Sequence, residues 1–308
     1  MMEVCAVVVT YNRKEILQEC VNAILNQTVK VAKLIIVDNN STDGTEEFLE
    51  EKGIRNIPDI EYMKLPQNIG GAGGFYEGMK KAAAYKPDWV WIMDDDVIPK
   101  ENALEELLNA QKNIEGKISF LASAVRGLHD EAMNVPKLSK KQFMSYTDWY
   151  RYLDEGVVQI VKATFVSLLI NIKAIEKCGY PWKEFFIWGD DSEYTQRIIR
   201  DYGPAYMVGR SHVIHKRASS DALSIVKEEN VNRIQMYFYY YRNNLIGFWE
   251  YENTVYRILC MGKLFYDFVT VLLRAKYKCK KMAVIIKAFC AFVFGTYDRK
   301  AFKNRAKL

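Results

Sequence analysis

The chain has 308 residues, of which 50% are hydrophobic and 26% charged, and only 7 are proline. This composition is that of a folded protein and excludes collagen, coiled coils and disordered chains. The length suits one large α/β domain, or one domain with an appendage.

Charge is distributed unevenly along the chain. The net charge is +5, yet segment 254–308 contains 13 Lys and Arg against 2 Asp and Glu, a net of +11, and the rest of the chain is at −6. An asymmetry of this size indicates that the C-terminal region has a partner of opposite charge.

The cysteines and histidines exclude zinc ribbons and fingers, because the 6 cysteines form no C-x-x-C pair and the chain has 3 histidines. Near the N-terminus, Glu3 stands where a secretion signal has basic residues, and the apolar run that follows ends in a polar turn. We expect no secretion signal, a reducing compartment and free thiols.

Predicted strands and helices alternate through the first hundred residues. The apolar, β-branched run over 3–10 predicts a strand buried on both faces, and the i, i+3, i+4 spacing over 14–26 predicts an amphipathic helix. Alternation favours a parallel sheet, in which ligands bind at the carboxyl ends of strands. Further elements predicted are strands over 33–37, 61–65 and 89–93, helices over 45–52 and 75–85, and a glycine-rich turn over 70–74.

The second half of the chain reads as α+β. We predict a helix over 102–113, strands near 118–124 and 157–170, helices over 173–177 and 190–200, and helices from about residue 231 to the end.

The C-terminal helices contain no apolar stretch of the roughly 18 to 20 residues needed to span a bilayer. The longest runs, 264–273 and 282–294, are interrupted by Asp267 and Lys287. Interleaved basic, aromatic and apolar residues favour helices that lie on an anionic membrane surface. The alternative is that these helices pack on the protein body and their lysines are solvated.

Three aspartates, Asp94, Asp95 and Asp96, follow the predicted strand over 89–93. Three adjacent carboxylates repel one another unless a cation lies among them, and a divalent cation bound to a diphosphate would serve. If the pleat continues, Asp94 and Asp96 point to one side and Asp95 to the other. The alternative is an exposed acidic turn.

The glycine-rich segment over 68–75 would let the backbone approach a phosphate or a sugar closely, just before a helix N-terminus. It lacks the Lys-Ser/Thr pair of a P-loop and the spacing of a dinucleotide fingerprint. The sequence therefore supports neither an ATPase nor a dinucleotide-dependent enzyme.

A second acidic run, Trp188 to Glu193, precedes the predicted helix over 190–200. Asp190 could simply cap that helix. A carboxylate at a helix start is also well placed to accept a proton from an acceptor hydroxyl group. Of the histidines, His129, His212 and His215, any one alone is more often structural than a ligand.

Together these motifs resemble the inverting nucleotide-sugar glycosyltransferases of the GT-A fold called family 2, over roughly residues 3–250. Five motifs in the family's order are more specific than any one. Within the family, the glycine-rich segment 68–75, the run from Trp91 to Asp96 and the run from Trp188 to Glu193 look most like the galactofuranosyltransferases that build cell-surface glycans, and Gly189 departs from that pattern. The motifs are residues 8–13, 37–45, 94–96, 189–193 with His215, and 239–243.

The resemblance implies an α/β fold, a GT-A (Rossmann-like) mixed sheet flanked by helices over 1–250, followed by a helical, basic, membrane-associating region over 251–308. It implies a metal-dependent enzyme that moves galactofuranose from UDP-galactofuranose to a hydroxyl group of a lipid-linked glycan in O-antigen or capsule synthesis. The alternatives are a rhamnosyltransferase that uses dTDP-rhamnose, or a transferase for another UDP-sugar. The chain lacks the extra domains of the polymerising mycobacterial enzyme, so we expect single-residue addition.

The resemblance also implies roles for individual residues. Asp191 would be the catalytic base, and Trp188 and Asp190 would orient the sugar or acceptor. Mn²⁺ or Mg²⁺ would be bound by Asp94, Asp96 and His215. The uridine would be held by Thr10, Tyr11, Arg13 and Asp38, and the donor would be bordered by Asn68, Gly73, Asp94 and Asp95.

Two other classes of protein are weaker readings of this sequence. A subunit that binds a UDP-sugar without turning it over does not need all of the acidic residues in the 94–96 and 188–193 runs. In a nucleic-acid binder, these acidic clusters would repel the phosphate backbone. We therefore expect no nucleic acid partner. The expected partners are a UDP-sugar, a glycan acceptor and an anionic membrane, with a cytoplasmic location peripheral to the inner face of the cell membrane.

Overall fold

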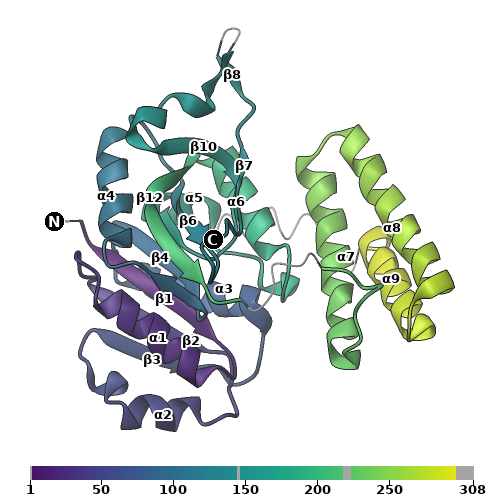
Figure 1. The fold of residues 1–308 in the computed structure, drawn as a ribbon, viewed down its shortest axis with the longest axis horizontal. Helices are drawn as coiled ribbons and strands as arrows, with labels where there is room; N and C mark the ends of the chain where they lie inside the picture. The colour runs from purple at the N-terminus through teal and green to yellow at the C-terminus, as the bar shows by residue number, and fades with distance from the viewer. Residues whose placement is uncertain (1, 144–145, 218–222, 296–308) are drawn as a thin grey trace.

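A ten-stranded mixed sheet forms the centre of the computed structural model, which describes residues 2–143, 146–217 and 223–295 (Figure 1). Its strand order is β3-β2-β1-β4-β11-β6-β12-β10-β7, and β5 pairs with β12. The four strands of the first half are parallel: β1 (Val4–Thr10), β2 (Lys33–Asp38), β3 (Ile60–Lys64) and β4 (Trp89–Asp94). The predicted parallel sheet is therefore one half of a mixed sheet.

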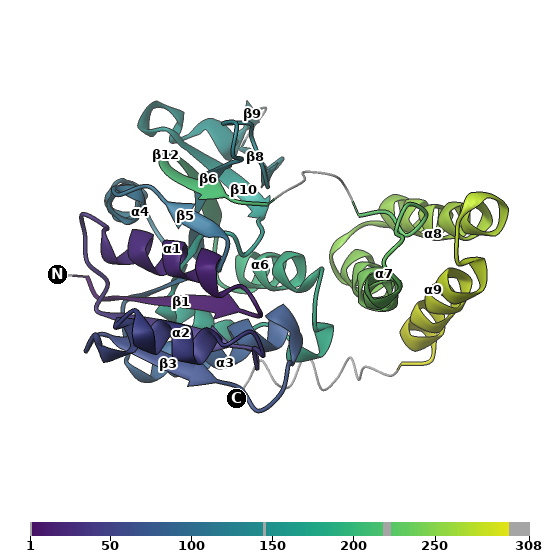
Figure 2. The same ribbon diagram turned by 60° about the horizontal axis from the view of Figure 1, so that its bottom comes forward.

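Helices connect these parallel strands and cover both faces of the sheet (Figure 2). Val4, Ala6 and Val8 of β1 pack in one core cluster with α1, while Val7 and Val9 pack in a second cluster with α3. This alternation explains why the strand is apolar throughout, since side chains of period two reach two buried faces. The helices are α1 (Lys14–Leu25), α2 (Thr45–Glu51), α3 (Gly70–Ala84) and the 3₁₀ turn η1 (Ile54–Asn56).

The glycine-rich segment over 70–74 is helical, where a turn was predicted, and forms the first turns of α3. A Cβ on Gly74 would lie 2.4 Å from Val9, and one on Gly78 would lie 2.4 Å from Val7. The glycines thus let α3 pack closely against β1, and this packing outweighs their low intrinsic helix propensity.

Antiparallel pairing builds the second half of the sheet. β11 (Leu168–Asn171) is antiparallel to β4, and β12 (Ala205–His215) is antiparallel to β5 (Val97–Pro99) and to β10 (Val157–Lys162). The predicted strand region over 157–170 is thus two strands, and β12 was not predicted because Arg210 and His212 interrupt its apolar pattern. The remaining elements are β6 (Phe120–Arg126), β7 (Lys137–Leu138), β8 (Gln142–Phe143), β9 (Tyr146–Thr147), α4 (Ala103–Asn113), α5 (Ile172–Cys178), α6 (Asp190–Asp201), η2 (Asp148–Tyr150), η3 (Leu153–Glu155) and η4 (Lys183–Phe185).

Three C-terminal helices form a group beside the sheet (Figure 1): α7 (Val231–Tyr251), α8 (Thr254–Arg274) and α9 (Lys278–Val293). They share a core cluster that includes Tyr237, Val271 and Ile285. A further cluster joins them to the sheet domain through Ala72 of α3 and Phe185. The predicted boundary at residue 250 falls at the end of α7, although α7 packs with α8 and α9.

None of the helices in the described part of the chain combines the length and the apolar character that a membrane span requires. The 6 cysteines all lie among the described residues and are free.

Candidate active site

The carboxyl ends of three parallel strands meet at one edge of the sheet. Thr10 at the end of β1 is in register with Asp38 at the end of β2, and Asp94 ends β4 beside Val9. Sheet geometry therefore brings together side chains that are far apart in the sequence.

β4 ends at Asp94, and Asp95 and Asp96 form a turn before β5, so the condition that the pleat continues does not hold. Asp95 is not part of the group formed by Asp94, Asp96 and His215, and its carboxylate is bonded to Thr10 and Arg13. Its Oδ2 accepts a hydrogen bond of 2.7 Å from the hydroxyl of Thr10, and its Oδ1 lies 3.2 Å from Arg13 Nη1.

Arg13, predicted to hold uridine, lies against this acidic turn. Its Nη1 donates to Asp96 Oδ2 at 2.8 Å as well as to Asp95, while its side chain remains half exposed. The guanidinium thus offsets part of the negative charge that the turn concentrates.

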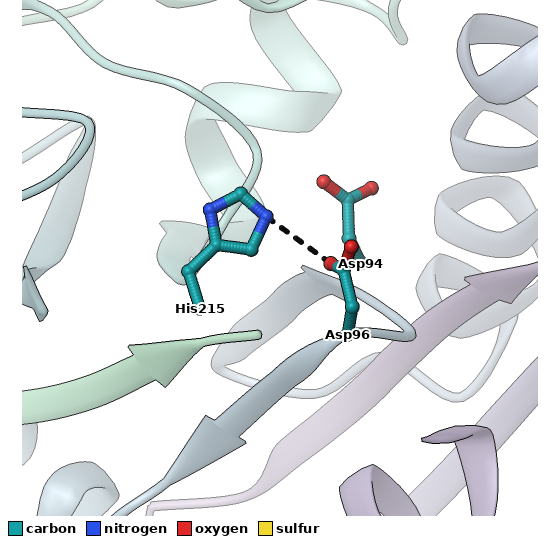
Figure 3. A group of neighbouring side chains, drawn as sticks. All are labelled: Asp94, Asp96 and His215. Atoms are coloured by element: carbon teal, nitrogen blue, oxygen red, sulfur yellow. Dashed lines mark ion pairs between the residues drawn. The ribbon is translucent and has the colours of Figure 1, made fainter. Parts of the chain in front are cut away.

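Asp94, Asp96 and His215, the three predicted metal ligands, lie together at this edge (Figure 3). Each offers one ligand atom, and these atoms lie within 4.8 Å of one another. The pairing of β5 with β12 causes this arrangement, since His215 lies opposite Val97, the residue after Asp96.

The hydrogen bonds of these side chains fit a cation. Nδ1 of His215 donates to Asn134 Oδ1 at 2.9 Å, and Nε2 lies 3.2 Å from Asp96 Oδ1, where a protonated imidazole forms an ion pair. That Oδ1 is buried. An unprotonated Nε2 would instead offer its lone pair together with the carboxylate oxygens to a cation, and one His with two carboxylates suits Mn²⁺.

The electrostatics of the three aspartates differ. Burial and the neighbouring carboxylates raise the pKa of Asp94, and burial raises the pKa of Asp95 to about 6 despite Arg13 and Thr10. Burial would also raise the pKa of Asp96, but His215 and Arg13 outweigh it and lower that pKa. The raised pKa values of Asp94 and Asp95 mean that their negative charges are poorly stabilised by the surrounding protein. A bound cation would stabilise these charges.

Asp38 is fully buried, and both of its carboxylate oxygens have partners in the structure. The backbone N–H of Ser41 donates to Oδ1 at 2.7 Å, and the hydroxyl of Tyr62 donates to Oδ2. Asp38 therefore orders the loop that follows β2.

Asn39 was not assigned a role from the sequence, although it follows Asp38 directly. Its Nδ2 donates to the carbonyl oxygen of Gly70 at 2.8 Å, and its Oδ1 accepts from the N–H of Ile69 at 3.0 Å. Asn39 thus holds the start of α3 against the loop after β2. Its role could not be predicted from the sequence, because the sequence does not show that this side chain is only 3% exposed.

The predicted donor-bordering residues of the glycine-rich segment lie at different depths. Asn68 is exposed and accepts from the N–H of Gly70, whereas Gly73 is buried with Ile69 beside it. Gly70 has φ of +77°, and a Cβ there would lie 2.1 Å from the carbonyl oxygen of Phe186. Gly70 thus lets the start of α3 lie close to Phe186, whereas the sequence predicted a close approach of this backbone to a phosphate or a sugar. Tyr11, at the end of β1, is 43% exposed.

The second acidic run begins α6. Gly189, with φ of +93°, is the N-cap, so Asp190 does not cap the helix and instead lies with Asp191 in its first turn. A positive φ of this size explains why glycine occupies this position. The side chain at Asp191 accepts from the N–H of Ser192.

The charge of Asp190 contributes to the raised pKa of Asp94, which indicates that the first turn of α6 lies on the same side of the molecule as the metal-ligand group. Burial and the charge of Asp191 raise the pKa of Asp190 to about 8. Burial also raises the pKa of Asp191, against the hydrogen bond from Ser192 and the charge of Lys162. A carboxylate with a raised pKa is a better general base near neutral pH.

Glu193, the last carboxylate of the run, has a structural role. It is 2% exposed and forms a two-bond ion pair with Arg197, at 2.9 and 3.0 Å, and it accepts from the hydroxyl of Tyr251. The ion pair lies within α6, and the bond from Tyr251 joins α6 to the end of α7.

Asn243 of α7 supports the loop before α6 and was not identified as a site residue from the sequence. It is 1% exposed, and its Nδ2 lies 2.9, 3.2 and 2.7 Å from the carbonyl oxygens of Phe185, Ile187 and Trp188. Trp188, predicted to orient the sugar, packs its ring 5.3 Å from that of Tyr237. The 239–243 motif marked Asn243 in the sequence, but nothing in that motif indicated that its side chain would bond to the loop before α6.

Comparisons with known proteins agree with one another. A family model described as Glycosyl transferase family 2 matches residues 5–169. Galactofuranosyltransferase GlfT1 of Mycolicibacterium smegmatis is 27% identical over 207 residues, 64% of this chain and 65% of that protein. The chain thus matches slightly less than two thirds of that relative's length.

Two further proteins are similar. Poly(ribitol-phosphate) beta-N-acetylglucosaminyltransferase TarP of Staphylococcus aureus is 30% identical over 235 residues, 74% of this chain and 67% of that protein. The crystal structure of GalNAc-T7 with UDP, GalNAc and Mn²⁺ superimposes with a TM-score of 0.56 at 14% identity, over 80% of this chain and 52% of that one.

Proposed function

The chain belongs to glycosyl transferase family 2, with a mixed sheet of the GT-A type, and we propose that it moves galactofuranose from UDP-galactofuranose to a hydroxyl group of a glycan acceptor. The similarity to GlfT1 and the order of the sequence motifs support the choice of sugar. Cell-surface polysaccharide synthesis is the process in which such a transfer takes part.

The observation that carries the proposal is a group of possible metal ligands at the edge of the sheet where the parallel strands end. Asp94, Asp96 and His215 offer ligand atoms within 4.8 Å of one another. Asp190, in the first turn of α6 with Asp191, is near enough to interact electrostatically with Asp94. A transferase needs a cation-binding group for the diphosphate and a base for the acceptor within one site.

The proposed reaction is a direct displacement with inversion. Asp191 accepts the proton of the acceptor hydroxyl group while its oxygen forms a bond to the anomeric carbon, and the bond from that carbon to the diphosphate breaks on the opposite side. A Mn²⁺ or Mg²⁺ ion held by Asp94, Asp96 and His215 would stabilise the charge of the departing UDP. Asp190 and Trp188 orient the sugar and the acceptor.

The donor would lie along the ends of β1, β2 and β4. We propose that Thr10, Tyr11, Arg13 and Asp38 hold the uridine. Tyr11, which follows β1, has an aromatic side chain that is 43% exposed, and this supports stacking on a base. The bordering residues would be Asn68, Gly73, Asp94 and Asp95.

A second donor has specific support. TarP, named as an N-acetylglucosaminyltransferase, is 30% identical over 74% of this chain. UDP-N-acetylglucosamine is therefore the competing UDP-sugar, ahead of dTDP-rhamnose, which none of the named relatives suggests.

We further propose that residues 1–250 carry the transferase activity and that residues 251–308 associate with an anionic membrane at the inner face of the cell, where a lipid-linked acceptor would lie. The charge of segment 254–308, 13 basic against 2 acidic residues, supports this division.

The test is the release of UDP or dTDP by the full chain with Mn²⁺, supplied in turn with UDP-galactofuranose, UDP-galactopyranose, UDP-glucose, UDP-N-acetylglucosamine and dTDP-rhamnose. We expect consumption of UDP-galactofuranose alone, abolished by EDTA and by Asp96→Ala. Turnover of UDP-N-acetylglucosamine instead would retain the chemistry and reject the sugar, and release that persists in EDTA would reject the metal assignment.

A further inference from the structure

Helix α8 has the opposite amphipathicity to that of a helix packed on a domain. Of its 21 residues, those that are buried are Asp267 and Val271. An ordinary surface helix buries its apolar side and exposes its charged side. Here the large apolar side chains point outward, with exposed fractions from 47% to 69% at Val255, Ile258, Leu259, Phe265, Tyr266, Leu272 and Leu273.

These seven residues form one continuous face, which we call the α8 apolar face. Their positions recur at intervals of three, four and seven, so they lie on one side of the helix along its whole length. The positions between them on that side are Gly262 and Val269, and no charged residue interrupts it. In both views α7 stands between α8 and the sheet (Figures 1 and 2), and the opposite side of α8, at Asp267, bonds to Tyr241 of α7.

Buried polar bonds hold this orientation. Asp267 is 8% exposed, and its Oδ2 accepts from the hydroxyl of Tyr241 in α7 at 2.8 Å and from Lys263 at 2.7 Å. Rotating α8 to bury its apolar face would expose or unpair these groups. Helix α9 differs, because it buries mainly apolar side chains, although Lys281 is also buried and donates to the carbonyl oxygen of Val226 at 3.0 Å.

The charges beside the face select its partner. Within 254–295 the single carboxylate is Asp267, which is buried, whereas Lys263 and Arg274 flank the α8 apolar face and further lysines follow it on α9. A second copy of the chain would offer the same cations and no exposed carboxylate from its own α8 or α9 to pair with them. An anionic lipid surface offers phosphates to the cations and acyl chains to the apolar face.

We propose that the α8 apolar face inserts into the headgroup region of an anionic membrane. The proposal rests on the membrane association suggested above and specifies the helix face that makes it. Its aromatic members, Phe265 and Tyr266, are of the kind that favours this interfacial depth.

This docking face connects to the acceptor side of the candidate active site through α7. Tyr241 of α7 bonds to Asp267 of α8, and two residues along the same helix Asn243 holds the loop that ends at Trp188. Docking of α8 therefore fixes the loop before Asp190 at a set position relative to the bilayer, as an acceptor carried by a lipid requires.

The experiment is flotation of the full chain with vesicles of phosphatidylcholine alone, or of phosphatidylcholine with phosphatidylglycerol. We expect binding to the anionic vesicles, lowered at least about tenfold by Phe265→Asp with Leu273→Asp. Replacing Lys278 and Lys280 by Gln should lower it by about fivefold for each charge removed. Leu153→Asp, at a side chain that is 50% exposed on the sheet domain, is the matched control and should bind as the unaltered chain does.

UDP release is measured on every variant. A folded α8 variant should still release UDP although it no longer binds vesicles, so this measurement distinguishes a failure of the proposed transferase activity from a failure of membrane binding. No binding to anionic vesicles, or binding that the α8 variants leave intact, would overturn the proposal. Light scattering could instead show that the unaltered chain is a dimer and that the Phe265 and Leu273 substitutions make it a monomer. Together with no vesicle binding, that result would assign the α8 apolar face to contact with a second copy of the chain.

Discussion

The side-chain nitrogen of Asn243 lies 2.7 Å from the carbonyl oxygen of Trp188, and this bond joins α7 to the loop that begins α6. The same Nδ2 lies within bonding distance of two further carbonyl groups, so one buried amide supports the backbone just before Asp190. The C-terminal helices therefore contribute to the candidate site as well as to its surroundings.

Asn243→Leu should unfold at lower urea concentration, with a loss of about 1 to 3 kcal/mol for a buried polar group left without its partner. Turnover should fall while UDP affinity, measured by calorimetry, stays close to that of the unaltered chain. Asn244→Ala is the control, because Asn244 bonds to Tyr240 of its own helix. Equal effects of the two changes would reject the positioning role.

Asn134→Ala should weaken Mn²⁺ binding in the presence of UDP by about 10- to 100-fold, since His215 loses the acceptor that sets its tautomer. His215→Ala should weaken it further. Free Mn²⁺ is measured by electron paramagnetic resonance. His212→Ala is the control three positions earlier on β12, where the ring bonds to the carbonyl oxygen of Gly209; an equal loss there would argue against a ligand role for His215.

Asp191→Asn should lower transfer to an unactivated sugar acceptor by about 10² to 10⁴, the usual contribution of a general base. Binding of UDP should persist. Asp201→Asn, near the far end of α6 and paired with Arg200, serves as the control. Full turnover by Asp191→Asn would assign the base elsewhere.

The stability of the metal-free protein should depend on pH through Asp190, whose pKa burial and Asp191 raise from 3.8 to about 8. Between these values the folded chain holds the proton and the unfolded chain does not, so stability from this group falls as pH rises. Asp190→Asn removes the effect. The free energy of unfolding of this variant, measured in urea, should therefore rise relative to that of the unaltered chain from pH 5 to pH 8, by at most roughly 1.4 kcal/mol per pH unit. A difference in unfolding free energy that does not change with pH would contradict the raised pKa of Asp190.

Gly70→Ala should destabilise the protein by at least about 2 kcal/mol, because φ is +77° and the new Cβ would clash with the carbonyl oxygen of Phe186. Gly71→Ala is the matched control on the next residue. No atom lies within 4 Å of a Cβ there, so a gain of about 0.5 to 1 kcal/mol is expected from helix propensity. Thermal unfolding of both variants separates the two outcomes.

The parallel half of the fold was predictable because each segment carries its own period. Six residues of helical spacing over 14–26 and an apolar run over 3–10 suffice to define α1 and β1, and the structure agrees within a residue or two. The antiparallel half depends on partners distant in sequence. β12 contains Arg210 and His212, and its strand form follows from pairing with β6, β10 and β5.

The candidate site divides in the same way. Asp94, Asp96 and His215 were grouped through the resemblance, and their assembly depends on the β5–β12 pairing, which no local pattern reveals. The supporting amides could not be found, because Asn39, Asn134 and Asn243 act on backbone or side chains more than 29 positions away. Burial of an amide becomes visible only after the chain has folded.

The pairing of His215 with Asp96 also has a kinetic meaning. Asp96 lies in the turn before β5 and His215 at the end of β12, so more than a third of the chain separates them in sequence. Contacts between residues this far apart slow folding, because the chain between them must first be brought together. A cation bound by both side chains would link the two ends of this long segment, and the ability to bind it would report that β5 and β12 have paired.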